Sequence, residues 1–322
     1  SCDLYMNEKK IVIIGAGVSG LLCGARLSEA GHSVHVIDKG RNIGGRLSTR
    51  RKDGAVFHHG ACSLPDFYKQ EDLPEFGLEI FKRAEKTRII HRVGHLFEPV
   101  SSVSNLVNFL ATDLKIQVSS EATSLNLQNK TLELRQTDKE RKQISYDFLI
   151  LSIPPSQARN LINSKIDRFD DHLNKVRMRA SAAALFSFNL NPETVRATHF
   201  SNENIQVEVE NNRFKCEQKL LCLTVHTKEP FAREVVSNEK NKIKEILFGE
   251  LSSIFPVSLP KPTYAAGHRW LYGFTERSLG KPYLFYEKEN VGVCGDWCSG
   301  STILNAASSG IELAEQILKK YT

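Results

Sequence analysis

The sequence lacks the cysteine patterns that mark a disulfide-bonded or zinc-binding protein. It contains seven cysteines, an odd number, and no two of them have the CxxC spacing of metal ligands. Cys23, Cys216 and Cys222 lie in helix or strand patterns, which predicts that they are small core residues. Unpaired cysteines are typical of a reducing compartment, so we expect a cytoplasmic protein without a bound metal.

Long hydrophobic runs are also scarce. Residues 11–27 are apolar enough to resemble the core of a signal peptide, but they contain a glycine pattern and follow the acidic residues Asp3 and Glu8. No other run approaches the length of a transmembrane helix. We therefore expect neither a cleaved leader nor a membrane span.

Charge of one sign is not concentrated in any part of the chain. The formal net charge of the 322 residues is +6 and the pI is about 8.8. The densest basic stretches, 82–92 and 135–142, contain no interleaved aromatic residues, which argues against a nucleic-acid partner. Internal repeats and low-complexity linkers are missing as well. With 41% hydrophobic residues, the chain suits one large domain or two closely packed ones.

The clearest pattern that is present is a glycine-rich turn near the N-terminus. Residues 11–14 form a continuous apolar run, as expected of a strand buried on both faces. Gly15 permits a tight turn, Gly17 lets backbone approach a pyrophosphate, and Gly20 lets the following helix pack close to the strand. Asp38 closes the next apolar run, where a carboxylate accepts hydrogen bonds from ribose hydroxyls. The unit predicts a dinucleotide site at a helix N-terminus, whereas an ordinary glycine-rich turn would leave Asp38 unexplained.

A second glycine pair, Gly44 and Gly45, follows this unit. Adjacent glycines let backbone N–H groups turn toward a pyrophosphate or a flavin, and Arg46 can offer a fork to phosphate. The alternative is a solvated basic turn. His58 and His59 come next in a short strand, but no carboxylate or cysteine lies at ligand spacing, so we predict no metal there.

The middle of the chain predicts antiparallel strands inserted between pieces of a parallel sheet. The expected helices are 104–115 with Ser104 as N-cap, one starting at 158–162, and 240–255; the expected strands are 116–118, 122–127, 131–135, 146–153, 180–190, 220–225 and 263–272.

The C-terminal pattern supplies the other half of the site. Residues 291–294 predict a last buried strand, Gly295 allows close backbone approach, and Asp296 can accept a hydrogen bond from a ribityl hydroxyl. The small residues 299–302 can cap a final helix at 303–318, whose N-terminus would stabilise the negative charge of a reduced flavin. The first motif alone would also suit NAD, but the two motifs together indicate FAD and an oxidoreductase.

The chain resembles the renalase-like flavoproteins, within the wider amine oxidase and protoporphyrinogen oxidase superfamily. The resemblance covers nearly the whole chain. Its most specific matches are His268-Arg269-Trp270-Leu271-Tyr272 and Cys294-Gly295-Asp296-Trp297-Cys298, and the other matching segments are 15–20, 38–48, 54–61 and 148–155.

This resemblance implies an α/β fold with a Rossmann-type FAD-binding domain of the hydroxybenzoate hydroxylase or glutathione reductase kind, interleaved with a substrate domain on a mixed or antiparallel sheet. FAD would be bound non-covalently. Family members of known activity oxidise dihydronicotinamide dinucleotides reduced at the wrong ring position, pass the hydride to flavin N5 and the electrons to oxygen, and release hydrogen peroxide. The expected division is 1–66, 100–158 and 285–322 for the FAD-binding domain, and 67–99 and 159–284 for the substrate domain.

Together, the motifs and the resemblance predict FAD contacts along the whole cofactor. The predicted contact residues are Gly15, Gly17, Val18, Ser19, Gly20, Asp38, Lys39, Gly45, Arg46, Leu47, His59, Gly60, Ala61, Val118, Gly295, Asp296, Thr302 and Ile303.

A hydride oxidase needs a dry cavity over the flavin more than it needs acid–base groups. We predict that His59, Trp270 and Tyr272 form its catalytic walls, with Phe57 as a further candidate. Trp270 and Tyr272 are two residues apart on a strand and face the same side, where they can stack on a flat substrate or simply pack in the core. His268 faces that side too and is a candidate for substrate contact or proton handling.

The chain departs from the family pattern around the expected flavin ring. Family members usually have an acidic residue where His58 stands and glutamine where Cys62 stands. An arginine, a glutamate and a glycine are replaced by Thr302, Leu304 and Asn305. The alternatives to renalase-like oxidation are therefore amine oxidation or desaturation on the same fold, or FAD binding without catalysis.

Overall fold

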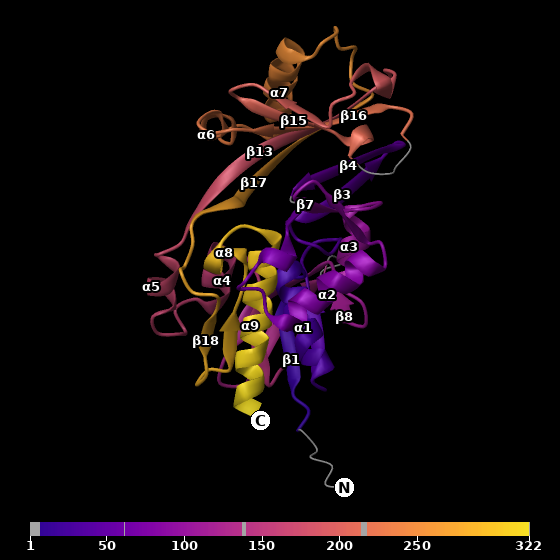
Figure 1. Ribbon diagram of the computed structural model, residues 1–322. Helices are drawn as coiled ribbons and strands as arrows, with labels where there is room; N and C mark the ends of the chain where they lie inside the picture. The colour runs from indigo at the N-terminus through magenta and orange to yellow at the C-terminus, as the bar shows by residue number, and fades with distance from the viewer. Residues whose placement is uncertain (1–6, 61, 137–139, 214–217, 322) are drawn as a thin grey trace.

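We analysed a computed structural model of the chain, which describes residues 7–60, 62–136, 140–213 and 218–321. Two large sheets organise these residues (Figure 1). A six-stranded sheet lies in the half that holds both termini, and a five-stranded antiparallel sheet forms the other half. The long strands β13 (Arg177–Phe188) and β17 (Tyr264–Arg277) run between the two halves as a paired ribbon.

The six-stranded sheet has the order β18-β19-β12-β1-β2-β8. All neighbouring strands are parallel except the pair β18 and β19. Its central strands are apolar runs buried on both faces, as parallel strands between two covering layers must be. The strands are β1 (Lys10–Ile14), β2 (Ser33–Ile37), β8 (Lys115–Gln117), β12 (Phe148–Leu151), β18 (Leu284–Tyr286) and β19 (Val291–Val293).

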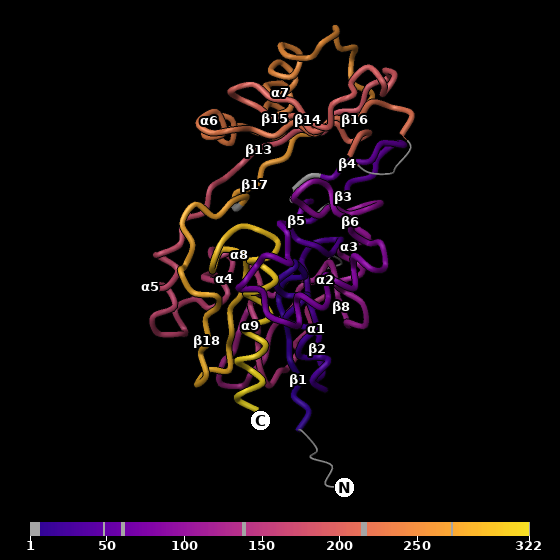
Figure 2. The backbone as a smooth tube through the Cα atoms, viewed as in Figure 1, coloured from indigo at the N-terminus to yellow at the C-terminus, as the bar shows by residue number. Residues whose placement is uncertain are grey.

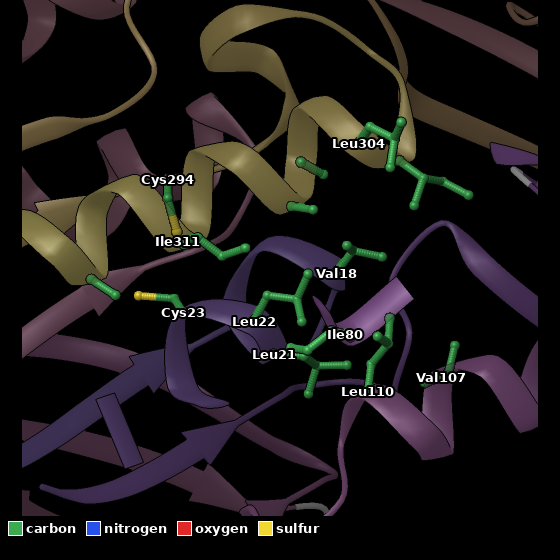
Figure 3. Packing of buried hydrophobic residues seen from close by; sticks show 14 of the residues in the cluster. Val18, Leu21, Leu22, Cys23, Ile80, Val107, Leu110, Cys294, Leu304 and Ile311 are labelled. Carbon is green, nitrogen blue, oxygen red and sulfur yellow. The ribbon is translucent and has the colours of Figure 1, made fainter. Parts of the chain in front are cut away.

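Helices cover one face of this sheet. They are α1 (Val18–Glu29), α2 (Glu75–Lys86), α3 (Val103–Leu110) and α9 (Ile303–Tyr321), and their apolar side chains form one core cluster (Figure 3). In Figure 2 the yellow C-terminal segment lies beside the indigo N-terminal one, and Gly310 of α9 packs against Ser19 of α1. The first and last helices of the chain therefore share one interface.

The other face of the sheet carries a small antiparallel sheet and two short helices. Their apolar residues form a second core cluster, to which Trp297 belongs. The elements are β9 (Ser120–Asn126), β10 (Thr131–Gln136), β11 (Arg141–Ser145), α4 (Pro155–Ile162) and α5 (Phe169–Leu173).

The five-stranded sheet has the order β14-β15-β16-β13-β17. Helix α7 (Lys240–Ile254) covers one face with Ile243, Leu247 and Leu251. The opposite face meets a hairpin, β3 (Leu47–Lys52) and β4 (Ala55–Gly60), through Phe57. The remaining elements are β5 (Leu64–Pro65), β6 (Ile90–Val93), β7 (Leu96–Pro99), β14 (His199–Ser201), β15 (Ile205–Val209), β16 (Leu221–Thr227), α6 (Phe231–Val235), α8 (Asp296–Ser299) and three short 3-10 turns at 67–69, 192–194 and 210–212.

The predicted elements are largely confirmed, with corrections at their ends. Helix α3 spans Val103–Leu110 and not the predicted 104–115. Its N-cap lies two residues earlier than predicted, because Ser102 and not Ser104 accepts the hydrogen bond from the amide of Asn105. Strands β13 and β17 extend beyond the predicted 180–190 and 263–272 boundaries toward the other half. Pairing with each other satisfies their backbone groups where local sequence shows no clear strand pattern.

Residues 67–99 pack differently from the expected grouping with the substrate domain. Phe67, Ile80, Phe81 and Phe97 lie in the core cluster that also holds α1 and α9. The apolar face of α2 is thus buried against the helices of the parallel sheet and not against the antiparallel one. The amphipathic sequence of α2 gives it one apolar face, and only the packing of the chain decides which partner covers that face.

The interface between α1 and α9 should tolerate no side chain at Gly310. A Cβ there would lie 2.0 Å from the carbonyl oxygen of Ser19, so Gly310→Ala should lower the free energy of unfolding by about 1–3 kcal/mol despite the better helix propensity of alanine. Gly249 on α7 is exposed with no atom near its Cβ position, so Gly249→Ala should raise stability by about 0.5–1 kcal/mol. Denaturant unfolding followed by circular dichroism measures both. Equal stabilisation by the two substitutions would contradict the close helix contact.

Candidate active site

The strand–turn–helix at the N-terminus is as tight as its glycines require. A Cβ on Gly15 would lie 2.0 Å from the carbonyl oxygen of Ser152, and φ of Gly15 is +108°. A Cβ on Gly20 would lie 2.2 Å from the carbonyl oxygen of Gly15. These contacts draw the first turn of α1, with Val18 and Ser19, close to the ends of β1 and β12.

The two glycine segments of the sequence meet in space. The Cβ position of Gly45 lies 3.2 Å from the Cα of Gly17, so backbone approaches backbone there with no side chain between. A Cβ on Gly17 would have no neighbour closer than 3.9 Å, and α1 has no side-chain cap at this residue. The open space and the uncapped N–H groups fit a pyrophosphate at the helix N-terminus.

Asp38 lies at the carboxyl end of β2, beside this turn. Its carboxylate accepts hydrogen bonds from the amides of Ala16, at 2.8 Å, and Gly40, at 2.7 Å. Val118 lies nearby, since the amide of Ser119 donates to the carbonyl of Gly40, and 38% of Val118 is exposed. The Asp38 carboxylate lies where a dinucleotide site would hold a ribose, and the exposed Val118 side chain lies where it would hold an adenine.

Arg46 joins three distant parts of the chain. Its guanidinium donates to the Asp296 carboxylate at 2.7 Å and 2.6 Å and to the carbonyl oxygen of Gly273 at 2.9 Å. Burial raises the pKa of Asp296, and the Arg46 guanidinium opposes that shift. The Arg46 guanidinium was predicted to bind a phosphate. In the structure it bonds instead to the carboxylate of Asp296, at the start of α8, and to the backbone of β17.

The C-terminal motif is held by its own hydrogen bonds. The amide of Gly295 donates to Ser309 at 2.9 Å, and Trp297 Nε1 donates to the carbonyl of Ile153 at 3.1 Å. Thr302 accepts from the amide of Asn305 at 3.0 Å, as the predicted cap of α9. Helix starts at α1, α8 and α9 thus converge on one end of the parallel sheet, where ligands bind in open α/β folds.

Three rings line the face of the antiparallel sheet that meets the hairpin. Trp270 stacks beside both His226 and His268: the ring centroids are 6.4 Å and 6.0 Å apart, and the interplanar angles are 22° and 20°. We call His226, Trp270 and His268 the ring row. His226 and His268 are both opposite Ala183 in the sheet, so the row crosses three neighbouring strands.

His268 is a neutral imidazole. Arg50 of the hairpin contacts its Nε2 at 3.3 Å, and because arginine only donates, Nε2 is an acceptor and the proton is on Nδ1. Burial lowers the pKa of His268 to about 4, and the charges of Arg50 and Lys240 act in the same direction. Above about pH 4, the His268 end of the ring row is therefore uncharged.

A buried ionic cluster lies beside the ring row, between the hairpin and the sheet. Glu210 is its centre: it accepts from Thr224 Oγ1 at 2.7 Å, and its other oxygen lies 3.0 Å from His58 Nδ1. Arg213 lies 3.9 Å from Glu210 and 3.6 Å from Glu208, and it also donates to the Cys62 thiol. We define the buried ionic cluster as His58, Cys62, Glu208, Glu210, Arg213 and Thr224.

Most of the predicted site residues are brought together by the fold. The predicted residues of the two glycine segments meet, Asp38 and Val118 adjoin them, and Gly295 to Ile303 converge on the same end of the sheet. Lys39 is exposed beside Asp38, and Leu47 is buried at the start of β3. Ala61 and the side chains of His59 and Tyr272 lie outside the described part of the structure, so the roles predicted for them stay predictions.

Sequence reasoning missed the residues that join the two halves. Four of these residues lie outside every sequence motif and contact residues of the predicted site or its surroundings: Arg50, His226, Glu210 and Arg213. The alternating pattern of residues 222–226 contained the signal for His226, because an imidazole then shares a strand face with Thr224. Glu210 and Arg213 follow a strand end, and no local pattern predicts their burial.

Comparison with known proteins identifies the family. Residues 92–318 match the family described as flavin containing amine oxidoreductase, and residues 13–77 match the NAD(P)-binding Rossmann-like domain. The chain belongs to the flavin containing amine oxidoreductase family. Membership of this family indicates FAD as the cofactor, and the uncapped α1 and the Gly17–Gly45 approach fit FAD.

Individual relatives match either a short segment or the fold. The 4,4'-diapophytoene desaturase (4,4'-diaponeurosporene-forming) of Staphylococcus aureus is 45% identical over 62 residues, which are 19% of this chain and 12% of that enzyme. A candidate protoporphyrinogen oxidase from Exiguobacterium sp. 255-15 has a TM-score of 0.69 at 12% identity, covering 98% of this chain and 100% of that one. An oxidoreductase from Methanosarcina mazei has a TM-score of 0.67 at 16% identity, covering 95% and 100%. These two structures share the fold with this chain.

Two further structural findings concern the predicted absence of metal and membrane. Within residues 7–60, 62–136, 140–213 and 218–321, no three His, Cys, Asp or Glu side chains gather as a metal site would require. Across the same described ranges, every helix is too short or too polar to cross a lipid bilayer.

Retention of FAD should depend on the pair of Arg46 and Asp296. Arg46→Ala leaves a mostly buried carboxylate without its cation, so we expect the affinity for FAD to fall at least about tenfold. Arg46→Lys keeps the charge but loses the forked guanidinium, so its affinity for FAD should lie between those of the wild type and Arg46→Ala. Titration of apoprotein with FAD, followed by flavin fluorescence, measures the effect. Arg51→Ala, at an exposed position of β3, the strand that follows Arg46, is the control, and unchanged affinity in Arg46→Ala would contradict the assignment.

The free energy of unfolding should decrease as the pH is lowered, partly because of His268. Its pKa is about 4 when folded and about 6.5 when unfolded, so between these values the unfolded chain binds a proton that the folded chain does not. Stability is therefore lost as pH falls through this window. Between pH 7 and pH 4, we expect the free energy of unfolding of His268→Gln to fall by about 1–2 kcal/mol less than that of the wild type, after allowance for solvent screening. Urea unfolding at both pH values tests this, with His95→Gln as an exposed control.

Proposed function

We propose that the protein is a renalase-like oxidase that removes a hydride from a flat, reduced substrate such as an isomeric dihydronicotinamide dinucleotide. The observation that carries this proposal is the ring row. It presents an indole beside two imidazoles on the sheet face that meets the hairpin, and a flat substrate can stack there. FAD, when bound, would supply the hydride acceptor, and transfer of the two electrons to oxygen would then give hydrogen peroxide.

The residues that would hold FAD follow from the site geometry. The turn at Gly15 to Gly20 and the loop at Gly45 would take the pyrophosphate, and Asp38 would take the adenosine ribose. Asp296, at the start of α8, and Thr302, which caps α9, would stand along the flavin end, with Ile303 behind them. These contacts need no covalent attachment, so we propose non-covalent FAD.

The substrate would lie between the ring row and the FAD-binding half. In this view the parallel sheet and its covering layers form the FAD-binding domain, of the hydroxybenzoate hydroxylase or glutathione reductase kind, and the five-stranded sheet forms the roof of a substrate domain. Trp270 would stack on the substrate ring, and neutral His268 would accept or donate a hydrogen bond without adding charge. Arg50 lies at the exposed side of His268, where a substrate phosphate would find a cation.

Oxidation of an amine is the second candidate, because the matched family is described as amine oxidoreductase. Removal of a hydride from an amine needs the same dry cavity. Desaturation has weaker support, since the match to the desaturase is confined to 62 residues.

The deciding experiment adds isomeric dihydronicotinamide dinucleotides to the anaerobic holoenzyme and follows the visible flavin band. We expect rapid bleaching, recovery of the colour in air, and one hydrogen peroxide for each substrate. Bleaching by amines only would move the assignment to the second candidate, and a flavin that neither donor reduces would contradict both.

Substitution of the ring row tests where the substrate binds. Trp270→Leu removes the stacking surface, so we expect the rate constant for flavin reduction to fall about tenfold or more. Leu271→Ala, at the next residue and 53% exposed, should leave the rate unchanged. Rapid-mixing absorbance measures both variants. Equal rates in Trp270→Leu and the wild type would exclude the ring row as the substrate platform.

A further inference from the structure

A cavity at the edge of the six-stranded sheet is lined by residues outside the ring row and the glycine segments. Strand β18 forms this edge, and α5 lies beside it (Figure 1). The cavity has a volume of about 330 Å³ and is lined by His172 of α5 and by residues 281–286, which comprise β18 and the three residues before it. Pockets for small ligands measure roughly 300–1,000 Å³, so this volume suits a small molecule with a single ring. We call this cavity the edge pocket.

Three aromatic side chains line the edge pocket: Tyr283, Phe285 and Tyr286. The Tyr286 ring meets Phe169 edge to face, with ring centroids 5.8 Å apart, and its hydroxyl oxygen lies 2.7 Å from His172 Nδ1. These contacts hold Tyr286 in place before any ligand binds. A flat ring can therefore pack against it at a small cost in side-chain entropy.

Three cations lie around the edge pocket. Lys281 lines it and is exposed. Burial lowers the pKa of His172, so its ring is neutral near pH 7. The charges of Lys281, Lys175 and Arg168 act on that pKa in the same direction, and the charge of Asp171 opposes them. The imidazole thus reports a positive surrounding to which it adds no charge itself.

The carboxylates near the edge pocket leave Lys281 available. Asp170 of α5 is paired with Arg159 at 3.2 Å. Burial raises the pKa of Tyr286 and the charge of Glu289 adds to this shift, but Glu289 follows β18, whereas Lys281 precedes it. Among the residues that the structure describes, no carboxylate forms an ion pair with Lys281. An anion in the pocket would therefore meet an ammonium group that it need not share.

We propose that the edge pocket binds a small organic anion that carries a flat ring. The ring packs against the aromatic side chains, and the anionic group pairs with the Lys281 ammonium. A carboxylate and a phosphate share this chemistry, and probes of both kinds distinguish them. The site is independent of the proposed function, because its residues lie outside the predicted FAD site and the ring row.

Calorimetric titration of the holoenzyme with four probes tests this proposal. Phenyl phosphate and benzoate carry a ring and a charge, benzyl alcohol carries only the ring, and inorganic phosphate carries only the charge. We expect phenyl phosphate or benzoate to bind at least about tenfold tighter than benzyl alcohol and inorganic phosphate, because the charge and the ring each contribute up to about tenfold. The tighter of the two identifies the anionic group. The holoenzyme is used because Pro282 of the pocket is linked through Ser309 to Gly295 of the C-terminal motif.

Three substitutions locate the binding. Lys281→Ala should weaken phenyl phosphate and benzoate about tenfold and leave benzyl alcohol unchanged. Tyr283→Leu should weaken the probes that carry a ring and leave inorganic phosphate unchanged. Lys288→Ala is the matched control: it removes an exposed lysine two residues after β18, outside the pocket lining, and should change none of the affinities.

Trp270→Leu separates the edge pocket from the ring row, and we expect it to bind all four probes as the wild type does. Benzyl alcohol binding as tightly as the charged ring probes, or unchanged binding in Lys281→Ala, would overturn the proposal. Absence of heat with all four probes, or loss of binding in Trp270→Leu, would overturn it too. These titrations do not involve flavin reduction, so failure of the proposed function would leave their result unaffected.

Discussion

The arrangement of this protein depends on one contact between backbones, where Gly17 and Gly45 approach with no side chain between them. The contact sets the first turn of α1 against the loop that leads into β3. Because Arg46 follows Gly45 directly, its guanidinium then reaches both Asp296 and the carbonyl of Gly273. A single close approach thus brings together residues from the beginning, the late middle and the end of the chain, which is what a long dinucleotide requires.

The hairpin of β3 and β4 carries this geometry to the second half of the molecule. Its apolar residues pack on the antiparallel sheet, while Arg50 contacts His268 and His58 contacts Glu210. The hairpin therefore links the cofactor end of the parallel sheet to the face that holds the ring row. The ring row on that face, an indole beside two imidazoles, offers a flat substrate a surface on which to stack.

Local chemistry explains which parts of the fold the sequence predicted. The unit from β1 to Asp38 was clear because strand, glycines, helix and terminal acid each have a local requirement. The start of α3 was misplaced because Ser102 and Ser104 are both good caps, and only the hydrogen bond to Asn105 distinguishes them. Residues 67–99 pack on the helices of the parallel sheet, and local sequence does not predict this: an apolar helix face shows that a partner exists, and packing selects which one.

The sequence by itself determined the dinucleotide turn, the acidic residue after β2, the C-terminal motif and the candidate rings of β17. In these, residues close in the chain act together, so spacing is enough to predict them. Tertiary structure alone decided that Arg46 pairs with Asp296, that His226 completes the ring row, and that Glu210 and Arg213 are buried beside it. Those contacts join residues distant in the chain, and their energies depend on burial and on exact partners, which no local pattern contains.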